Sequence, residues 1–118
     1  MFTDSEMDRV FAALSHTSRR EMLDLIRDTP GLTVGELAAN FDVTRIAVMN
    51  HLKVLEEAQL VISERDGRAR RLYLNAVPIQ AIYERWTDTF SAHWLDRISL
   101  IKSVAEAAAT KIKRDLDE

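Results

Sequence analysis

The spacing of apolar residues near the start of the chain predicts two helices. The first covers residues 5 to 15, and Ser5 stands where a helix cap is expected. Its apolar positions have helical spacing and are Met7, Val10, Phe11 and Leu14. The second helix follows the cluster SHTS (residues 15–18), where Ser18 and Glu21 have capping-box spacing. It stops at TPG (residues 29–31).

Two further helices are predicted close together between residues 33 and 58. Thr33 and Glu36 form a capping box ahead of a short helix that ends near Asn40, and Thr44 caps a second helix that runs to about Ala58. Two helices joined by a tight connection are typical of a helix-turn-helix. The same pattern also fits a generic pair of packed helices.

A basic β-hairpin is predicted directly after this pair, over about residues 60–75. Two strands, residues 60–65 and 68–75, flank the turn signal Asp66-Gly67. Alternation along the second strand places Leu72 on one face and Tyr73 on the other. A hairpin in this position is the wing of a winged helix. It carries four arginines, which suit contacts with phosphates but could also simply keep the hairpin tip solvated: Arg65, Arg68, Arg70 and Arg71.

The last part of the chain, residues 78–118, reads as a long helix. Pro78 opens it, and its apolar positions recur every three or four residues. Unbroken, it would be about 60 Å long at 1.5 Å per residue, and Ser91 and Ser103 are candidate positions for a bend or restart. The rest of a single 118-residue domain is too small to cover this helix, so the same helix of a second copy is the expected partner. The predicted dimer interface, with the first helix contributing, is Val10, Phe11, Leu14, Ile82, Trp86, Phe90, Trp94, Ile98 and Ile101. The fold class is therefore mainly α with a small antiparallel β-hairpin, a winged helix-turn-helix with a long C-terminal dimerisation helix.

Composition and charge narrow the function. The chain has no cysteine, which excludes disulfides, thiolate metal sites and thiol nucleophiles and fits a reducing compartment. The N-terminus does not resemble a signal peptide and no apolar run is long enough for a membrane span, so a cytoplasmic protein is expected. Net charge is −3, yet residues 44–75 hold six basic and four acidic residues, which makes this segment +2 and the remainder −5. Basic charge is thus concentrated in the helix-turn-helix and wing, as on a protein that binds DNA.

The second helix of the helix-turn-helix has two faces. Val48, Leu52 and Leu55 share one stripe, which should face the core. On the opposite face, Arg45 suits guanine edges, Asn50 suits adenine edges, and Lys53 suits phosphate. Ile46 and Met49 could pack on thymine methyl groups, although the wing or the preceding helices could instead cover one of them. The predicted DNA-binding residues of this helix are Thr44, Arg45, Ile46, Met49, Asn50, His51 and Lys53.

Other chemistry is weakly supported. His51 is either structural or a phosphate contact, and a metal site built from Asp88, His93 and Asp96 is disfavoured by their spacing. The aromatic cluster of the last helix could line a pocket for an organic effector, but a dimer core is the commoner explanation. No phosphate loop, paired nucleophile and base, or metal motif is present, so neither an enzyme nor a cofactor is expected.

Several stretches together resemble the ArsR family of bacterial winged-helix repressors. They are FAALSHTSRREMLDLI (11–26), GELAANFDVTRIAVMNHLKVLEEAQLV (35–61) and RDGRARRLYLN (65–75). The resemblance implies a homodimeric transcription factor, usually a repressor, that releases double-stranded DNA when an effector binds. The chain departs from the family pattern in three respects. GELAANFDV (35–43) lacks the cysteines of the founding metal sensors, the acids around His93 do not match the family's zinc motif, and Met49 stands where a small hydroxyl residue is common.

The sequence therefore predicts a sequence-specific DNA-binding regulator. In this reading it is a homodimeric repressor of the ArsR type without a cysteine metal site, and its effector, if it has one, is unidentified. The alternative is a winged helix that serves as a protein-interaction module and does not bind DNA. The four wing arginines favour the first reading.

Overall fold

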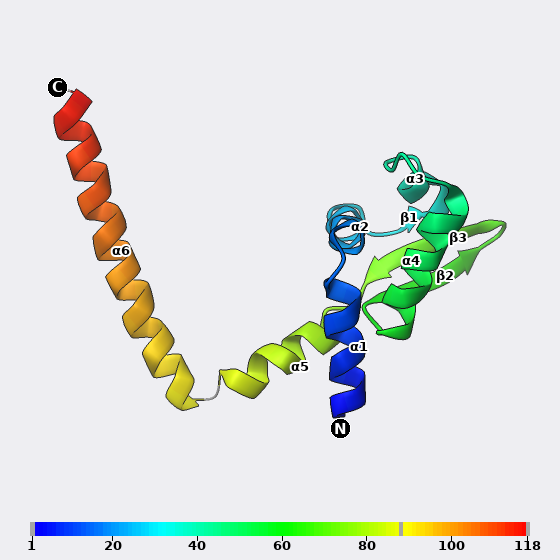
Figure 1. Ribbon diagram of the computed structural model, residues 1–118, viewed down its shortest axis with the longest axis horizontal. Coiled ribbons are helices and arrows are strands. Elements are labelled where there is room, and N and C mark those ends of the chain that lie inside the picture. The colour runs from blue at the N-terminus through cyan, green and yellow to red at the C-terminus, as the bar shows by residue number, and fades with distance from the viewer. Residues whose placement is uncertain (1, 88, 118) are drawn as a thin grey trace. The chain divides into compact units, whose positions relative to one another are not determined.

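The computed structural model describes the backbone of residues 2–87 and 89–117, and the side chains of residues 2–87 and 96–116 (Figure 1). The chain forms two compact units, Met1–Ile82 and Tyr83–Glu118. The elements are α1 (Asp4–Leu14), α2 (Thr17–Asp28), β1 (Leu32–Thr33), α3 (Val34–Ala38), α4 (Arg45–Glu57), β2 (Val61–Asp66), β3 (Ala69–Leu74), α5 (Val77–Trp86) and α6 (Thr89–Asp117). The predicted fold class, mainly helical with a small antiparallel sheet and a long C-terminal helix, is confirmed. None of the helices in the described part of the chain is both long and apolar enough to span a membrane.

The sheet has three antiparallel strands in the order β1-β3-β2, one more than the predicted hairpin. The added strand is the two-residue β1, in which Leu32 pairs with Leu72. The turn also differs by one position from the predicted Asp66-Gly67, because Asp66 is still paired with Ala69 in the ladder. The two turn residues are Gly67, at a φ of +63°, and Arg68, at a negative φ. A positive φ at the first central position is the pattern of a type II′ turn, which glycine adopts without strain.

The core of the first unit lies between the three longer helices and one face of the sheet. Helices α1, α2 and α4 contact one another, while α2 contacts β3 and α4 contacts β2 (Figure 1). The predicted inner stripe of α4 is confirmed, since Val48, Leu52 and Leu55 are all buried. The core consists of Val10, Ala13, Met22, Leu23, Ile26, Leu32, Val34, Leu37, Val48, Leu52, Leu55, Ala58, Leu60, Val61 and Leu72.

The helix caps agree with the sequence at two ends and differ at two others. Thr33 and Thr44 cap α3 and α4 as predicted, each accepting a hydrogen bond from a backbone N–H three residues on at 3.1 Å. The cap of α1 is Thr3 instead of Ser5, in a reciprocal capping box with Glu6. The cap of α2 is His16 instead of Ser18, and its Nδ1 accepts from the Ser18 N–H at 3.2 Å. These two helices therefore start earlier than predicted.

The predicted long terminal helix is two helices, α5 and α6. Helix α5 ends at Trp86 and α6 begins at Thr89, so the two helices do not meet near Ser91 or Ser103. Threonine and aspartate side chains bond to nearby backbone groups and favour helix ends over helix interiors. Serine at 103 stays within α6 because the alanine-rich sequence that follows has high helix propensity.

We expect the inner and outer faces of α4 to differ sharply in their effect on stability. Leu52 is 1% exposed and Ile46 is 74% exposed. Leu52→Ala should lower the free energy of unfolding by about 2–5 kcal/mol, because it leaves a cavity in the core. Ile46→Ala, as the matched control, should change it by less than about 0.5 kcal/mol. Urea denaturation measures both, and equal losses would contradict the assignment of the two faces.

Candidate nucleic-acid interface

The outer face of α4 presents a row of side chains that are not needed for the core. Ile46 is 74% exposed, and Asn50 and Lys53 are exposed beside it. Thr44 is also exposed, but its hydroxyl accepts the capping hydrogen bond from the Ala47 N–H at 3.1 Å. An amide, a cation and an apolar side chain in one exposed row can together contact base edges, thymine methyl groups and phosphate.

Arg45 and Met49 lie on the flank of α4 that faces the wing. They border an open cleft between the start of α3, α4 and the hairpin. Met49 is 40% exposed, so it is partly covered by this arrangement in a way that Ile46 is not. The eight residues that line the cleft are Thr33, Val34, Gly35, Arg45, Met49, Arg68, Ala69 and Arg70.

The four wing arginines fall into two pairs with different surroundings. Arg65 and Arg68 are exposed, and within the described part of the chain their side chains form no ion pair or hydrogen bond. Arg70 instead donates to the carboxylate of Glu56, near the end of α4. Arg71 donates from Nε to Asp66 at 2.8 Å and from Nη1 to the Gly31 carbonyl at 3.0 Å.

This pairing adds internal partners for two of the four arginines that the sequence assigns to phosphate. The hydrogen bond and the negative charge of Asp66 raise the pKa of Arg71 above its usual value, and Arg70 is only 37% exposed at its side chain. Sequence reasoning missed all three acceptors, which are Glu56, Asp66 and the Gly31 carbonyl. Glu56 and Glu57 are adjacent and equivalent in sequence, and a backbone carbonyl such as that of Gly31 leaves no sequence signal at all.

His51 lies on the opposite flank of α4, against the junction between α1 and α2. Its Nδ1 is 3.3 Å from Nη1 of Arg19, and its ring centroid is 4.6 Å from that of His16. Arg19 also donates to the carbonyls of Ala12 and Ala13, at 3.0 and 2.7 Å, at the end of α1. Because a guanidinium can only donate, His51 accepts at Nδ1 and is neutral in this arrangement. Burial lowers the pKa of His51, and the neighbouring charges of His16 and Arg19 lower it further.

The residues predicted to form the dimer interface differ in how deeply they are buried. Val10 is completely buried in the core of its own unit, so it cannot form part of an interface, which corrects that assignment. Leu14 and Ile82 are half-buried against the same core. Phe11, Trp86, Ile98 and Ile101 are exposed, by 48%, 57%, 57% and 68%. The side chains of Phe90 and Trp94 lie outside the described residues.

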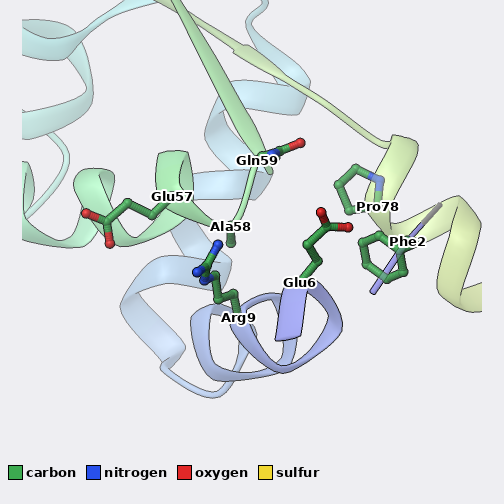
Figure 2. A pocket seen from close by; sticks show the side chains of 7 residues that line it. All are labelled: Phe2, Glu6, Arg9, Glu57, Ala58, Gln59 and Pro78. Carbon is green, nitrogen blue, oxygen red and sulfur yellow. The ribbon is translucent and has the colours of Figure 1, made fainter. Parts of the chain in front are cut away.

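One pocket is too small for an organic effector, and the described side chains form no cluster of metal ligands. A pocket near the chain's start is lined by Phe2, Glu6, Arg9, Glu57, Ala58, Gln59 and Pro78 (Figure 2). Its volume of about 20 Å³ is room for roughly one water, too little for an organic effector. Among the residues that the structure describes, no three His, Asp or Glu side chains cluster as metal ligands. The candidates Asp88 and His93 lie outside the described side chains.

A helix-turn-helix with an exposed recognition face and a cationic wing defines the class of winged-helix DNA-binding proteins. Comparison with known proteins agrees. The family model described as "Helix-turn-helix domain" matches residues 14–64. An uncharacterised HTH-type transcriptional regulator of Bacillus subtilis, YuzN, is 36% identical over 87 residues, covering 69% of this chain and 95% of that protein.

Two further comparisons indicate which family of transcriptional regulators the chain belongs to. The transcriptional repressor SdpR of B. subtilis is 31% identical over 74 residues, covering 63% of this chain and 81% of that protein. The solved structure of an ArsR-like transcriptional regulator from Rhodococcus sp. RHA1 has a TM-score of 0.63 and 31% identity, covering 86% of this chain and 93% of the other. The chain belongs to the ArsR family of winged helix-turn-helix regulators. It is a DNA-binding transcriptional regulator and not an enzyme.

The surroundings of His51 predict a loss of stability in mild acid. The folded state holds the pKa of His51 below the ordinary value of 6.5 for histidine, so the unfolded chain binds more protons as pH falls through that value. The contribution of His51 to stability should be complete above about pH 6.5 and decline below it. Urea denaturation at a series of pH values between about 7.5 and 5.5 should show this decline, and His51→Gln should flatten it. An identical slope in wild type and variant would contradict the assignment.

Proposed function

We propose that the chain is a homodimeric repressor without a cysteine metal site. In this proposal, α4 contacts the base edges of double-stranded DNA and the wing contacts its phosphates. The observation that carries this proposal is the exposed row Ile46, Asn50 and Lys53, together with two exposed wing arginines that have no partner among the described residues. The repressor role is supported by the likeness to SdpR, which is itself described as a transcriptional repressor. The absence of cysteine removes the thiolates that a sensor of soft metals would need.

The proposed contacts divide by chemistry. Arg45 and Asn50 read guanine and adenine edges, Ile46 and Met49 pack on thymine methyl groups, and Lys53 neutralises phosphate. Thr44 contributes by fixing the start of α4, and His51 by holding the opposite flank of α4 against Arg19. On the wing, Arg65 and Arg68 contact phosphate.

The salt dependence and sequence dependence of binding test this division. Binding to DNA fragments should weaken steeply with salt, because each neutralised phosphate releases condensed counterions. Arg68→Ala should weaken binding similarly on every sequence and reduce the salt slope by about 1. Asn50→Ala should instead cost about 1–3 kcal/mol on preferred sequences only, and relax the preference at one position. Fluorescence anisotropy on preferred and random duplexes measures both.

The competing function is a protein-interaction module. The high exposure of Ile46 is the observation that favours it, since exposed apolar side chains also suit a protein partner. Binding that is undetectable or insensitive to salt would reject DNA recognition and favour that alternative. Equal losses on preferred and random DNA for both variants would reject only the division of roles.

The proposed dimer rests on the exposed apolar side chains of α5 and α6. Every described side chain of α6 from Asp96 to Leu116 is exposed. A 29-residue helix with a long apolar stripe in water needs a partner to cover it. The stripe advances by alternating steps of three and four, the repeat that packs two helices together, and consists of Ile98, Ile101, Ala105, Ala108 and Ile112.

Two neighbouring residues on α6 test the stripe. Ile101 is 68% exposed and lies on it, whereas Leu100 is 66% exposed and lies off it. Ile101→Glu should give monomers, because it places charge within the interface, while Leu100→Glu should stay dimeric. Trp86→Glu should also give monomers or insoluble protein. Sedimentation should give twice the 13.5 kDa chain mass for the wild type, and a wild-type monomer would contradict the dimer.

A further inference from the structure

One ion pair joins the recognition helix to the wing. Glu56 lies in the last turn of α4 and Arg70 lies on β3, with side chains that are 26% and 37% exposed. They are 14 residues apart, so the pair spans the whole connection between α4 and the hairpin. Partial burial makes such a pair worth more than an exposed one, because water screens it less.

The middle of β3 is held by contacts that do not involve this pair. The Gly31 N–H donates to the Leu72 carbonyl at 2.9 Å, and Arg71 donates back to the Gly31 carbonyl at 3.0 Å. These contacts tie β3 to the loop between α2 and β1. They leave the distance from the hairpin to α4 to be set by other contacts, and Glu56 with Arg70 provides one.

Arg70 also lies directly opposite Arg65 in the strand register. The two side chains share a face of the hairpin and line one surface recess with Ser63. Like charges in facing positions repel each other across a sheet. The Glu56 carboxylate beside Arg70 offsets this repulsion between the two guanidinium groups.

We propose that Glu56 and Arg70 are positioning residues for DNA recognition. Glu56 holds the wing at a fixed distance from α4, and Arg70 acts through Glu56 and does not contact phosphate. The wing cations Arg65 and Arg68 are thereby ordered before DNA arrives, which lowers the entropy lost on binding. This inference rests on the proposed DNA recognition by α4 and the wing.

The salt slope separates a positioning role from a phosphate contact. Each phosphate contact contributes about 0.9 to the slope of log affinity against log salt, whereas a residue that only positions others contributes none. Arg68→Gln serves as the phosphate comparator, and should lower the slope by about 0.9. Arg70→Gln should leave the slope unchanged while still weakening the binding.

The test uses the full-length protein and two duplexes. The first is selected by the wild type from a random-sequence pool, and the second is its scrambled version. Glu56→Gln and Arg70→Gln should each weaken binding to the selected duplex by roughly fivefold or more, and the double variant should be no weaker than either single variant. Exchange of the pair, Glu56→Arg with Arg70→Glu, should restore most of the affinity. Thermal unfolding of each variant shows whether it is folded.

Glu57→Gln is the matched control. It removes the same negative charge one residue further along α4, so it reproduces any general gain in attraction to DNA. It should bind both duplexes no more weakly than the wild type. A loss with Glu56→Gln but not with Glu57→Gln therefore reports the contact and not the charge.

Several outcomes would overturn the inference. Stronger binding by Glu56→Gln than by Glu57→Gln, or a slope lowered by Arg70→Gln as by Arg68→Gln, would mean that Arg70 contacts phosphate. Additive losses in the double variant would mean that the pair does not act as a unit. If Arg70→Gln does not fold, Arg70→Lys replaces it and should weaken binding only when Glu56 is present. A wild type with no salt-dependent binding would reject the proposed function itself, whereas wild-type binding with uncoupled variants rejects this inference alone.

Discussion

Burial of one stripe of α4 determines how the rest of the chain can act. Val48, Leu52 and Leu55 are inserted between α1, α2 and the sheet, and their exposure is between 0 and 1%. An α-helix turns by about 100° per residue, so fixing one stripe fixes the direction of every other side chain on it. The helix cannot rotate to present a different face without exposing this core. Recognition chemistry is thus confined to the residues that remain outside.

The residues of α4 outside the core lie on three sides of the helix, and each side has different neighbours. Ile46 and its neighbours face solvent, Glu56 meets the wing through Arg70, and His51 meets Arg19. Arg19 in turn donates to the carbonyls of Ala12 and Ala13 near the end of α1, where the Ala12 carbonyl also accepts from Ser15. Helix α4 is therefore held on two sides. The Glu56–Arg70 ion pair joins it to the wing, and Arg19 joins it to the end of α1. The contacts of Glu56 and His51 hold α4 in place, so the side chains on its outer face are not needed for that purpose.

The features that could be predicted most accurately from the sequence are those that depend only on neighbouring residues. Thr33 and Thr44 cap their helices because a threonine side chain needs only the next turn of backbone, and the stripe of α4 follows from helical periodicity. Features that depend on contacts between distant segments were missed. The two-residue β1 has no pattern of its own and exists because Leu32 pairs with Leu72, and Arg70 finds Glu56 only after the hairpin has folded back. At the start of α2, His16 took the cap that Ser18 was expected to provide, because a histidine ring can also accept a backbone hydrogen bond.

The internal pairing of two arginines bears on the proposed dimer. The helix-turn-helix and wing carry six basic residues, but Arg70 and Arg71 are paired within the chain. In the proposed division of contacts, Lys53, Arg65 and Arg68 then remain for phosphate and Arg45 for guanine edges, on a protein whose net charge is −3. Each phosphate contact adds only a small, salt-sensitive increment, and three of them on an acidic protein give weak affinity at physiological salt. In the proposed dimer, two copies double the number of DNA contacts, and a fixed spacing lets both copies bind at once. The proposed roles of the apolar stripe of α6 and of the cationic wing are thereby linked.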